Sequence, residues 1–118
     1  MSTQNLDVVR AIYRAFAARK FPAELLAEGF VWVTAPDVPG GGSHEGHDAV
    51  RAYFRDWVAA WHEVESEVQE LIDRSDVVVA IIRGRYRLAP DGEQIEASYT
   101  HVWTLRDGKA VEARVTGG

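Results

Sequence analysis

The stretch "IEASYTHVWTLRDGKAVEARV", residues 95–115, carries the clearest structural signal in this chain. Its first part alternates from residue to residue and is rich in β-branched and aromatic side chains, as a strand is. "RDGK" at 106–109 is a hairpin signal, because Asp-Gly tolerates the positive φ angles of tight turns. The stretch therefore predicts two antiparallel strands, with Tyr99, His101 and Trp103 on one face.

Two more strands are predicted just upstream. Residues 63–73 and 77–88 are long and rich in Val and Ile, and "SD" at 75–76 turns one into the other. "APDGEQ" at 89–94 leads into the next strand. The four strands together form an antiparallel meander.

The N-terminal half predicts helices. Apolar residues at helical spacing indicate helices over 3–19 and 47–61, and Pro22 suits the start of a short helix over 22–29. "FVWVT" at 30–34 is a strand pattern, and the Gly- and Pro-rich residues 35–46 are interpreted as a flexible loop. We predict one α+β domain over residues 1–118, with helices on one face of the sheet.

A stripe of arginines indicates which face is outside. Arg83, Arg85 and Arg87 share one face of their strand, and unpaired arginines are rarely buried. Acidic residues on both neighbouring strands favour a solvated salt-bridge face over the alternative, an anion-binding strip. If Glu96, Ser98 and Thr100 point outward with the arginines, then Tyr99, His101 and Trp103 point toward the helices.

Composition narrows the function classes. The chain has 118 residues, a net charge of −5 and no clustered basic residues, so nucleic acid is not an expected partner. It has no cysteine, which excludes thiolate chemistry. No apolar run approaches the ~20 residues of a membrane span, and the N-terminus does not resemble a signal peptide. A cytoplasmic protein without a membrane partner is expected.

"HEGHDAVRAYF" at 44–54 and "HVWTLRDGKAVEARV" at 101–115, in this order of elements, resemble the nuclear transport factor 2-like superfamily. The similarity is greatest to its SnoaL-like polyketide cyclase, ketosteroid isomerase and limonene-epoxide hydrolase branches. The resemblance implies a conical barrel: a strongly bent, mostly antiparallel sheet whose N-terminal helices close an apolar cavity. It also implies a homodimer.

The resemblance transfers the fold better than the catalytic groups. His101 matches a histidine of SnoaL-like cyclases, but Val115 stands where those enzymes have an aspartate. Residues 34–36 lack the carboxylate of ketosteroid isomerase, and its tyrosine falls at Ile12, one residue before Tyr13. The hydrolase Asp-Arg-Asp set falls on Gly84, Ile82 and Val115, so that chemistry is not expected. Its water-holding tyrosine and asparagine fall at Trp32 and Thr34, which are expected to face the pocket.

The predicted pocket has a polar centre and aromatic walls. His101 is the expected base, and Tyr99 and Thr34 are expected hydrogen-bond donors. The alternative for His101 is a core histidine bonded to a tyrosine or a carbonyl. The expected ligand-binding residues are Tyr13, Phe16, Trp32, Tyr53, Trp57, Ile82, Gly84, Tyr86, Trp103, Ala113 and Val115, with Trp61 nearby. These aromatics could instead fill the core.

The histidines at 44 and 47 permit a metal site only in principle. Glu45 alone does not complete a ligand set, so no metal and no cofactor are expected. "GGGS" at 40–43 is not followed by the lysine of a phosphate loop. The loop is instead a candidate lid over the pocket.

These features predict a protein that binds a small hydrophobic or aromatic molecule and carries out cofactor-independent acid/base chemistry on it. Isomerisation, cyclisation, dehydration and hydrolysis all remain open. The alternatives are a non-catalytic ligand-binding module and a dimeric association module.

Overall fold

The computed structural model describes residues 2–35 and 41–117. The elements in this part of the chain are α1 (Ser2–Ala17), a single 3-10 turn η1 (Ala23–Leu25), β1 (Leu26–Thr34), β2 (Gly42–Glu45), α2 (His47–Ala59), β3 (Glu63–Arg74), β4 (Val77–Arg87), β5 (Ile95–Arg106) and β6 (Lys109–Gly117). Among the described helices, none combines the length and the apolar character needed to cross a membrane.

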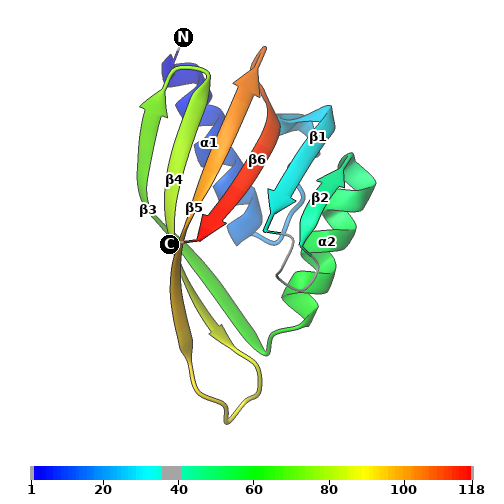
Figure 1. Cartoon of the computed structure of the whole chain (residues 1–118), viewed down its shortest axis with the longest axis vertical. Helices are drawn as coiled ribbons and strands as arrows, with labels where there is room; N and C mark the ends of the chain where they lie inside the picture. Colours follow the sequence, from blue (N-terminus) through cyan, green and yellow to red (C-terminus); the bar gives the residue numbers. More distant parts are fainter. Residues whose placement is uncertain (1, 36–40, 118) are drawn as a thin grey trace.

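The strands form one mixed, curved sheet in the order β2-β1-β6-β5-β4-β3 (Figure 1). The meander from β3 to β6 is antiparallel, as predicted, and β1 joins it through a parallel pairing with β6. The edge strands β2 and β3 do not pair with each other, so the cone is open rather than a closed barrel. The predicted α+β class and the mostly antiparallel sheet are confirmed.

The predicted helix over residues 22–29 is wrong. Only Ala23–Leu25 form a helical turn, and β1 begins at Leu26. The pairing of β1 with β6 shifts register between Leu26 and Val31, and Gly29 lies within this irregular stretch. Burial of Leu26 and Phe30 in the core, together with β-pairing, overrides the local helix preference of "PAELLAEG".

Part of the predicted loop over 35–46 is a strand. Residues Gly42–Glu45 form β2, which pairs antiparallel with β1 from Thr34↔Gly42 to Val31↔Glu45. This short edge strand is not visible in the sequence, because "GSHE" has little strand character and only the neighbour β1 stabilises it. Of the proposed lid, "GGGS" at 40–43, Gly42 and Ser43 belong to β2, and residue 40 lies outside the described residues.

The core lies between the helices and the concave face of the sheet. α1 contributes Val9 and Ile12, and α2 contributes Val50. From the sheet, Phe30 and Trp103 are almost completely buried against them. The remaining buried apolar members of this cluster are Leu26, Trp32, Val78, Ala80, Ile82, Leu105, Ala110 and Ala113.

The convex face carries the charged stripe that the sequence predicts. The register places Glu63, Glu65 and Glu67 of β3 opposite Arg87, Arg85 and Arg83 of β4. Arg87 pairs with Glu63 at 3.0 Å and Arg85 pairs with Glu65 at 3.1 Å. Arg85 and Arg87 are thus ion-paired on the outer surface and Arg83 lies on the same face, which places the alternate residues of β4 and β5 on the inner face.

Candidate functional site

His101 lies on the inner face of the sheet, as predicted from the alternation of β5. Its neighbours across the sheet are Ala80 on β4 and Val115 on β6. The residue is only 7% exposed, and this burial lowers its pKa to about 4. The imidazole is therefore neutral at pH 7.

A chain of two hydrogen bonds connects His101 to α1. The indole Nε1 of Trp103 donates to the hydroxyl of Tyr13 at 2.8 Å, and that hydroxyl lies 2.6 Å from Nδ1 of His101. An indole N–H can only donate, so Tyr13 accepts at this bond. Burial raises the pKa of Tyr13, which keeps its phenolic proton available.

The number of protons favours one tautomer of His101. If Tyr13 donates to Nδ1, the indole proton of Trp103 and the phenolic proton of Tyr13 each have an acceptor. The ring proton of His101 is then on Nε2. If Nδ1 carried the proton, the phenolic proton of Tyr13 would have no hydrogen-bond acceptor among the described residues. His101 is thus a neutral ring that offers an Nε2–H.

Sequence similarity placed the family tyrosine at Ile12, but the next residue reaches the site. Ile12 is completely buried in the core. Tyr13, about 100° further around α1, directs its ring and hydroxyl at His101. The hydrogen-bond partner of the histidine is therefore Tyr13 and not Tyr99, the tyrosine beside it on β5.

Aromatic rings surround the imidazole. The ring of Tyr13 is stacked at 5.9 Å between centroids, and Trp32 meets His101 edge-on at 5.1 Å. Tyr99 lies at 5.3 Å and Trp103 at 6.3 Å. Of the aromatic residues predicted from the sequence, Tyr13, Trp32, Tyr99 and Trp103 lie around the histidine.

Tyr99 belongs to a second polar group on the inner face. Its hydroxyl accepts a hydrogen bond from Tyr86 at 2.7 Å and lies 3.3 Å from the hydroxyl of Ser66. The phenol of Tyr86 lies directly over Gly84: a Cβ added there would be 1.9 Å from the Tyr86 hydroxyl oxygen. Gly84 thus makes room for the tyrosine pair rather than for a ligand.

Thr34 and Trp32 form the wall on β1. Thr34 is buried and accepts a hydrogen bond from the backbone N–H of Gly42 at 3.1 Å, so it holds β2 in place. Trp32 is 4% exposed, and among the described residues its Nε1 is the buried side-chain polar atom without a hydrogen bond of normal geometry, although its N–H acts on the Tyr53 phenol and lowers the pKa of that group. An unpaired buried donor costs about 1–3 kcal/mol, so it is an attractive contact for a ligand oxygen.

Tyr53 of α2 lies beside this wall. Its ring is 6.4 Å from that of Trp32 and 4.5 Å from that of His44 on β2. Burial raises the pKa of the Tyr53 phenol. Tyr53 therefore stays protonated at neutral pH and can donate a hydrogen bond.

The other predicted ligand-binding residues divide into three groups. Trp57 packs at 5.5 Å from Tyr86 and 6.2 Å from Trp61, and these three rings form a cluster at the rim. Phe16 packs against Phe54 and Tyr13 in the interior. Ile82, Ala113 and Val115 are inner-face sheet residues whose pairing partners are Tyr99, Trp103 and His101.

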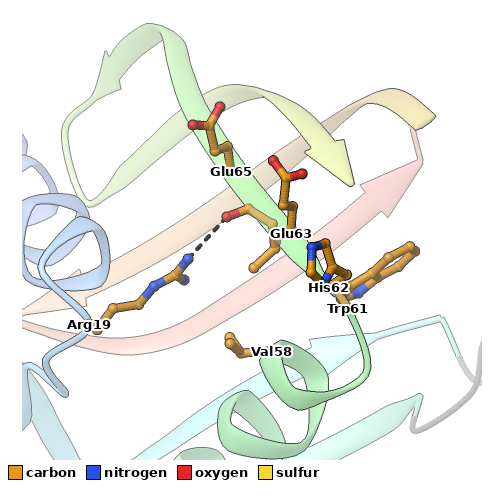
Figure 2. Close-up of a pocket in the computed structure, with 7 residues that line it drawn as sticks. Arg19, Val58, Trp61, His62, Glu63 and Glu65 are labelled. Atoms are coloured by element: carbon orange, nitrogen blue, oxygen red, sulfur yellow. Dashed lines mark hydrogen bonds between the residues drawn. The ribbon is translucent and has the colours of Figure 1, made fainter. Parts of the chain in front are cut away.

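Two hollows stand out on the described part of the chain, and His101 lines neither of them. One, of about 360 Å³, lies where α2 leads into β3 and is lined by Arg19, Val58, Trp61, His62, Glu63, Val64 and Glu65 (Figure 2). The other, of about 380 Å³, is a polar recess lined by Gln4, Asn5, Asp76, Leu105, Arg106, Asp107 and Gly108. Around His101 itself, aromatic side chains contact one another.

The two histidines near the start of α2, His44 and His47, contact different residues. Nε2 of His47 lies 2.9 Å from the carbonyl oxygen of Ala27 and 3.2 Å from that of Leu26, and so ties the start of α2 to β1. His44 stacks on Tyr53 instead. The described residues contain no group of three His, Cys, Asp or Glu side chains able to hold a metal ion.

Sequence reasoning missed two residues. Arg19 donates from Nη2 to the carbonyl oxygen of Val64 at 3.0 Å and lines the rim hollow. Phe54 packs 4.8 Å from Trp32, inside the aromatic interior. Phe54 could have been found from its helical spacing to Val50 and Trp57, whereas Arg19 in "ARKFP" has no pattern that sets it apart.

Several solved structures have the same fold. TerC, co-crystallised with polyporic acid, is 21% identical over 98% of this chain and 92% of its own, with a TM-score of 0.86. An NTF2-like protein of unknown function from Burkholderia pseudomallei is 27% identical over 98% and 91% of the two chains, with a TM-score of 0.85. A putative SnoaL-like polyketide cyclase from Jannaschia is 19% identical over 97% and 85%, with a TM-score of 0.81.

No curated protein matches the sequence significantly. The family model of the SnoaL-like domain, however, matches residues 9–113, which run from the middle of α1 to the middle of β6 and include the histidine on β5. With the open, bent sheet and the structural neighbours, this match establishes that the chain belongs to the SnoaL-like domain family of the NTF2-like superfamily.

Proposed function

We propose that the concave interior binds a small, planar aromatic molecule that carries oxygen atoms, and that His101 polarises a carbonyl group of that molecule. The relationship to polyketide cyclases supports this class of ligand. So does TerC, a protein of the same fold that was crystallised with polyporic acid.

The observation that carries the proposal is the pair of N–H donors in an aromatic cage. The Trp103–Tyr13–His101 chain favours a proton on Nε2 of His101, and Trp32 Nε1 is buried without a hydrogen bond of normal geometry. The two rings meet at 5.1 Å between centroids. A ligand carbonyl or hydroxyl oxygen would satisfy these donors, while its rings stack on the surrounding aromatics.

This arrangement favours a donor role for the histidine over a base role. A pKa of about 4 makes the imidazole a weak base at pH 7, and its Nδ1 is already hydrogen-bonded to Tyr13. A neutral imidazole N–H can stabilise negative charge that develops on a carbonyl oxygen, as in enolisation. Thr34 and His101 are the buried polar residues of the described chain, so a strong carboxylate base is not part of the interior.

Binding is tested with polyporic acid and a hydroxynaphthoquinone, using naphthalene as the oxygen-free control. The indole N–H signals of Trp32 and Trp103 in NMR spectra report the interior directly. We expect Trp32→Phe and His101→Gln each to weaken binding of the oxygenated probes by roughly threefold to tenfold. The control variant Arg114→Gln, at an exposed position on β6, should bind as the wild type does.

Catalysis is tested by hydrogen–deuterium exchange at the carbon next to the carbonyl of an aromatic β-diketone. Carbonyl polarisation accelerates this exchange, and His101→Gln should abolish the acceleration. Binding without accelerated exchange would support the alternative, a non-catalytic ligand-binding module. Absence of binding by all oxygenated probes would contradict the proposal.

A homodimer is the second proposal. Ile81 and Val102 are half-buried apolar residues on the convex face, next to the charged stripe. A partner covering this face would bury both side chains and meet alternating charges at the border. Sedimentation at micromolar concentration should give a dimer that Ile81→Glu dissociates, and a monomeric wild type would refute the assembly.

A further inference from the structure

The rim hollow has the features of a second binding site, independent of the interior. It is about 360 Å³ in volume, within the range of small-molecule sites. Its walls differ in character: Val58, Trp61 and Val64 are apolar, and Arg19 and His62 supply N–H groups. Figure 2 shows Arg19 reaching from the chain after α1 toward β3, with Val58 and Trp61 on the α2 side.

The backbone of Arg19 is in a conformation that normally selects glycine. Its φ angle is +59°, in the left-handed region. The N–H of Lys20 bonds to the carbonyl of Ala15 at 2.9 Å, and the N–H of Arg19 bonds to that of Phe16 at 3.0 Å, which is the Schellman motif that ends a helix. Glycine is the favoured residue at this position, so the arginine is held there against its local preference.

The acidic residues that line the hollow form ion pairs with arginines outside it. Glu63 and Glu65 form ion pairs with Arg87 and Arg85 on the convex face. In Figure 2 their carboxylates point away from Val58. Arg19 takes part in none of the ion pairs among the described residues, and its one described side-chain hydrogen bond goes to a backbone carbonyl. Its positive charge is therefore available to a ligand.

From these observations we propose that the rim hollow binds the carboxylate group of an aromatic or apolar acid. A guanidinium has five N–H donors, and the bond from Nη2 to Val64 leaves others for a carboxylate. The apolar part of the ligand lies on Trp61 and Val58. His62, exposed on the same wall, supplies a further N–H.

The rim hollow adjoins the interior but is not part of it. The Trp61 ring lies 4.9 Å from that of Tyr86, whose hydroxyl donates to Tyr99, and the Tyr99 ring lies 5.3 Å from His101. The rim site thus goes beyond the proposed function and does not depend on it. Its occupancy is read at Trp61, whereas the interior is read at Trp32 and Trp103.

The test uses naphthoate and its uncharged amide, naphthamide, titrated into the wild type at low salt. We expect naphthoate to shift the indole N–H signal of Trp61 and the side-chain signal of Arg19, and to bind roughly tenfold tighter than naphthamide. Added salt should weaken naphthoate binding selectively. Equal affinities for the acid and the amide, or shifts confined to Trp32 and Trp103, would overturn the proposal.

Arg19→Gly is the informative variant, because glycine suits the left-handed conformation and the fold should be kept. We expect it to lose roughly tenfold or more in affinity for naphthoate, with little change for naphthamide. Arg19→Asn, which also tolerates this conformation, serves as the second variant. Arg114→Gln removes an arginine that pairs with Glu112 on β6, away from the hollow, and should bind as the wild type does. Unchanged naphthoate affinity in both Arg19 variants would refute the site.

Discussion

The two faces of the meander formed by β3, β4 and β5 accommodate polar side chains in different environments, one in contact with solvent and the other buried. On the convex face, Arg85 and Glu65 are both exposed and form an ion pair in water. On the concave face, Tyr13, His101 and Trp103 share hydrogen bonds in a nearly dry interior. Outer pairs are screened by solvent, whereas an inner group that loses its partner has no water to replace it. The same strands therefore carry interactions of very different strength.

The largest difference between the faces should appear on deletion of Trp103. This fully buried ring packs against Phe30 and Trp32 and donates to Tyr13. We expect Trp103→Ala to lower the free energy of unfolding by about 3–5 kcal/mol, from the cavity and the lost hydrogen bond. Urea denaturation gives the value, with Trp61→Ala at the half-exposed rim as the control. An equal loss of unfolding free energy in both variants would show that the interior is no more sensitive to removal of a tryptophan side chain than the rim is.

The next effect is sensitivity to acid. The pKa of His101 is about 4 in the folded protein because of burial, against 6.5 for an exposed histidine. Between these values the unfolded chain binds a proton that the folded chain does not, so this term destabilises the fold as the pH falls from ~6.5 to ~4. The full loss is about 3 kcal/mol and is absent above pH ~7.

Urea unfolding of the wild type and of His101→Gln across this pH range measures the term. The variant should show a shallower loss of stability, because the glutamine does not titrate. His62→Gln, at an exposed position, should keep the wild-type pH profile. If His101→Gln also keeps it, the histidine is not the acid-sensitive group.

Substitution of Gly84 tests how tightly the Tyr86 phenol is packed against the inner face of the sheet. Gly84→Ala places a methyl group where the phenol of Tyr86 lies, and it should displace the ring and weaken the bond from Tyr86 to Tyr99. We expect a loss of about 1–3 kcal/mol in thermal or urea unfolding. Gly29→Ala is the matched control, since a Cβ there meets nothing within 4 Å. A Gly84→Ala variant as stable as the Gly29→Ala variant would mean that Tyr86 moves freely.

The smallest effect is expected on the convex face. A double-mutant cycle of Arg85→Ala and Glu65→Ala should give a coupling of about 0.2–1 kcal/mol. High salt should reduce it further, because both side chains are in contact with solvent. A coupling that is larger and insensitive to salt would remove the contrast between the two faces.

The amino-acid sequence alone was enough to predict the meander, its turns and the face of each strand that points outward. Side chains of a strand alternate between its two faces, so outward-pointing arginines at 83, 85 and 87 place Tyr86 on the inner face. The acidic residues of β3 and β5 share the outer face with these arginines, so His101 of β5 points inward. The same alternation predicted that Tyr99 and Trp103 lie beside His101, whereas Trp32 was expected there from the family resemblance. These are local signals, and each needs only the neighbouring strands.

The tertiary structure decided the features that depend on distant partners. Residues 26–30 became part of a strand because Leu26 and the residues from Val31 onward pair with β6, some eighty residues later in the chain. The hydroxyl that bonds to His101 comes from Tyr13, 88 residues away, and one residue of error on a helix rotates a side chain out of the site. Arg19 faces Val64 because a left-handed residue ends α1 beside β3. No local pattern encodes such contacts, since they arise only when helices and sheet pack together.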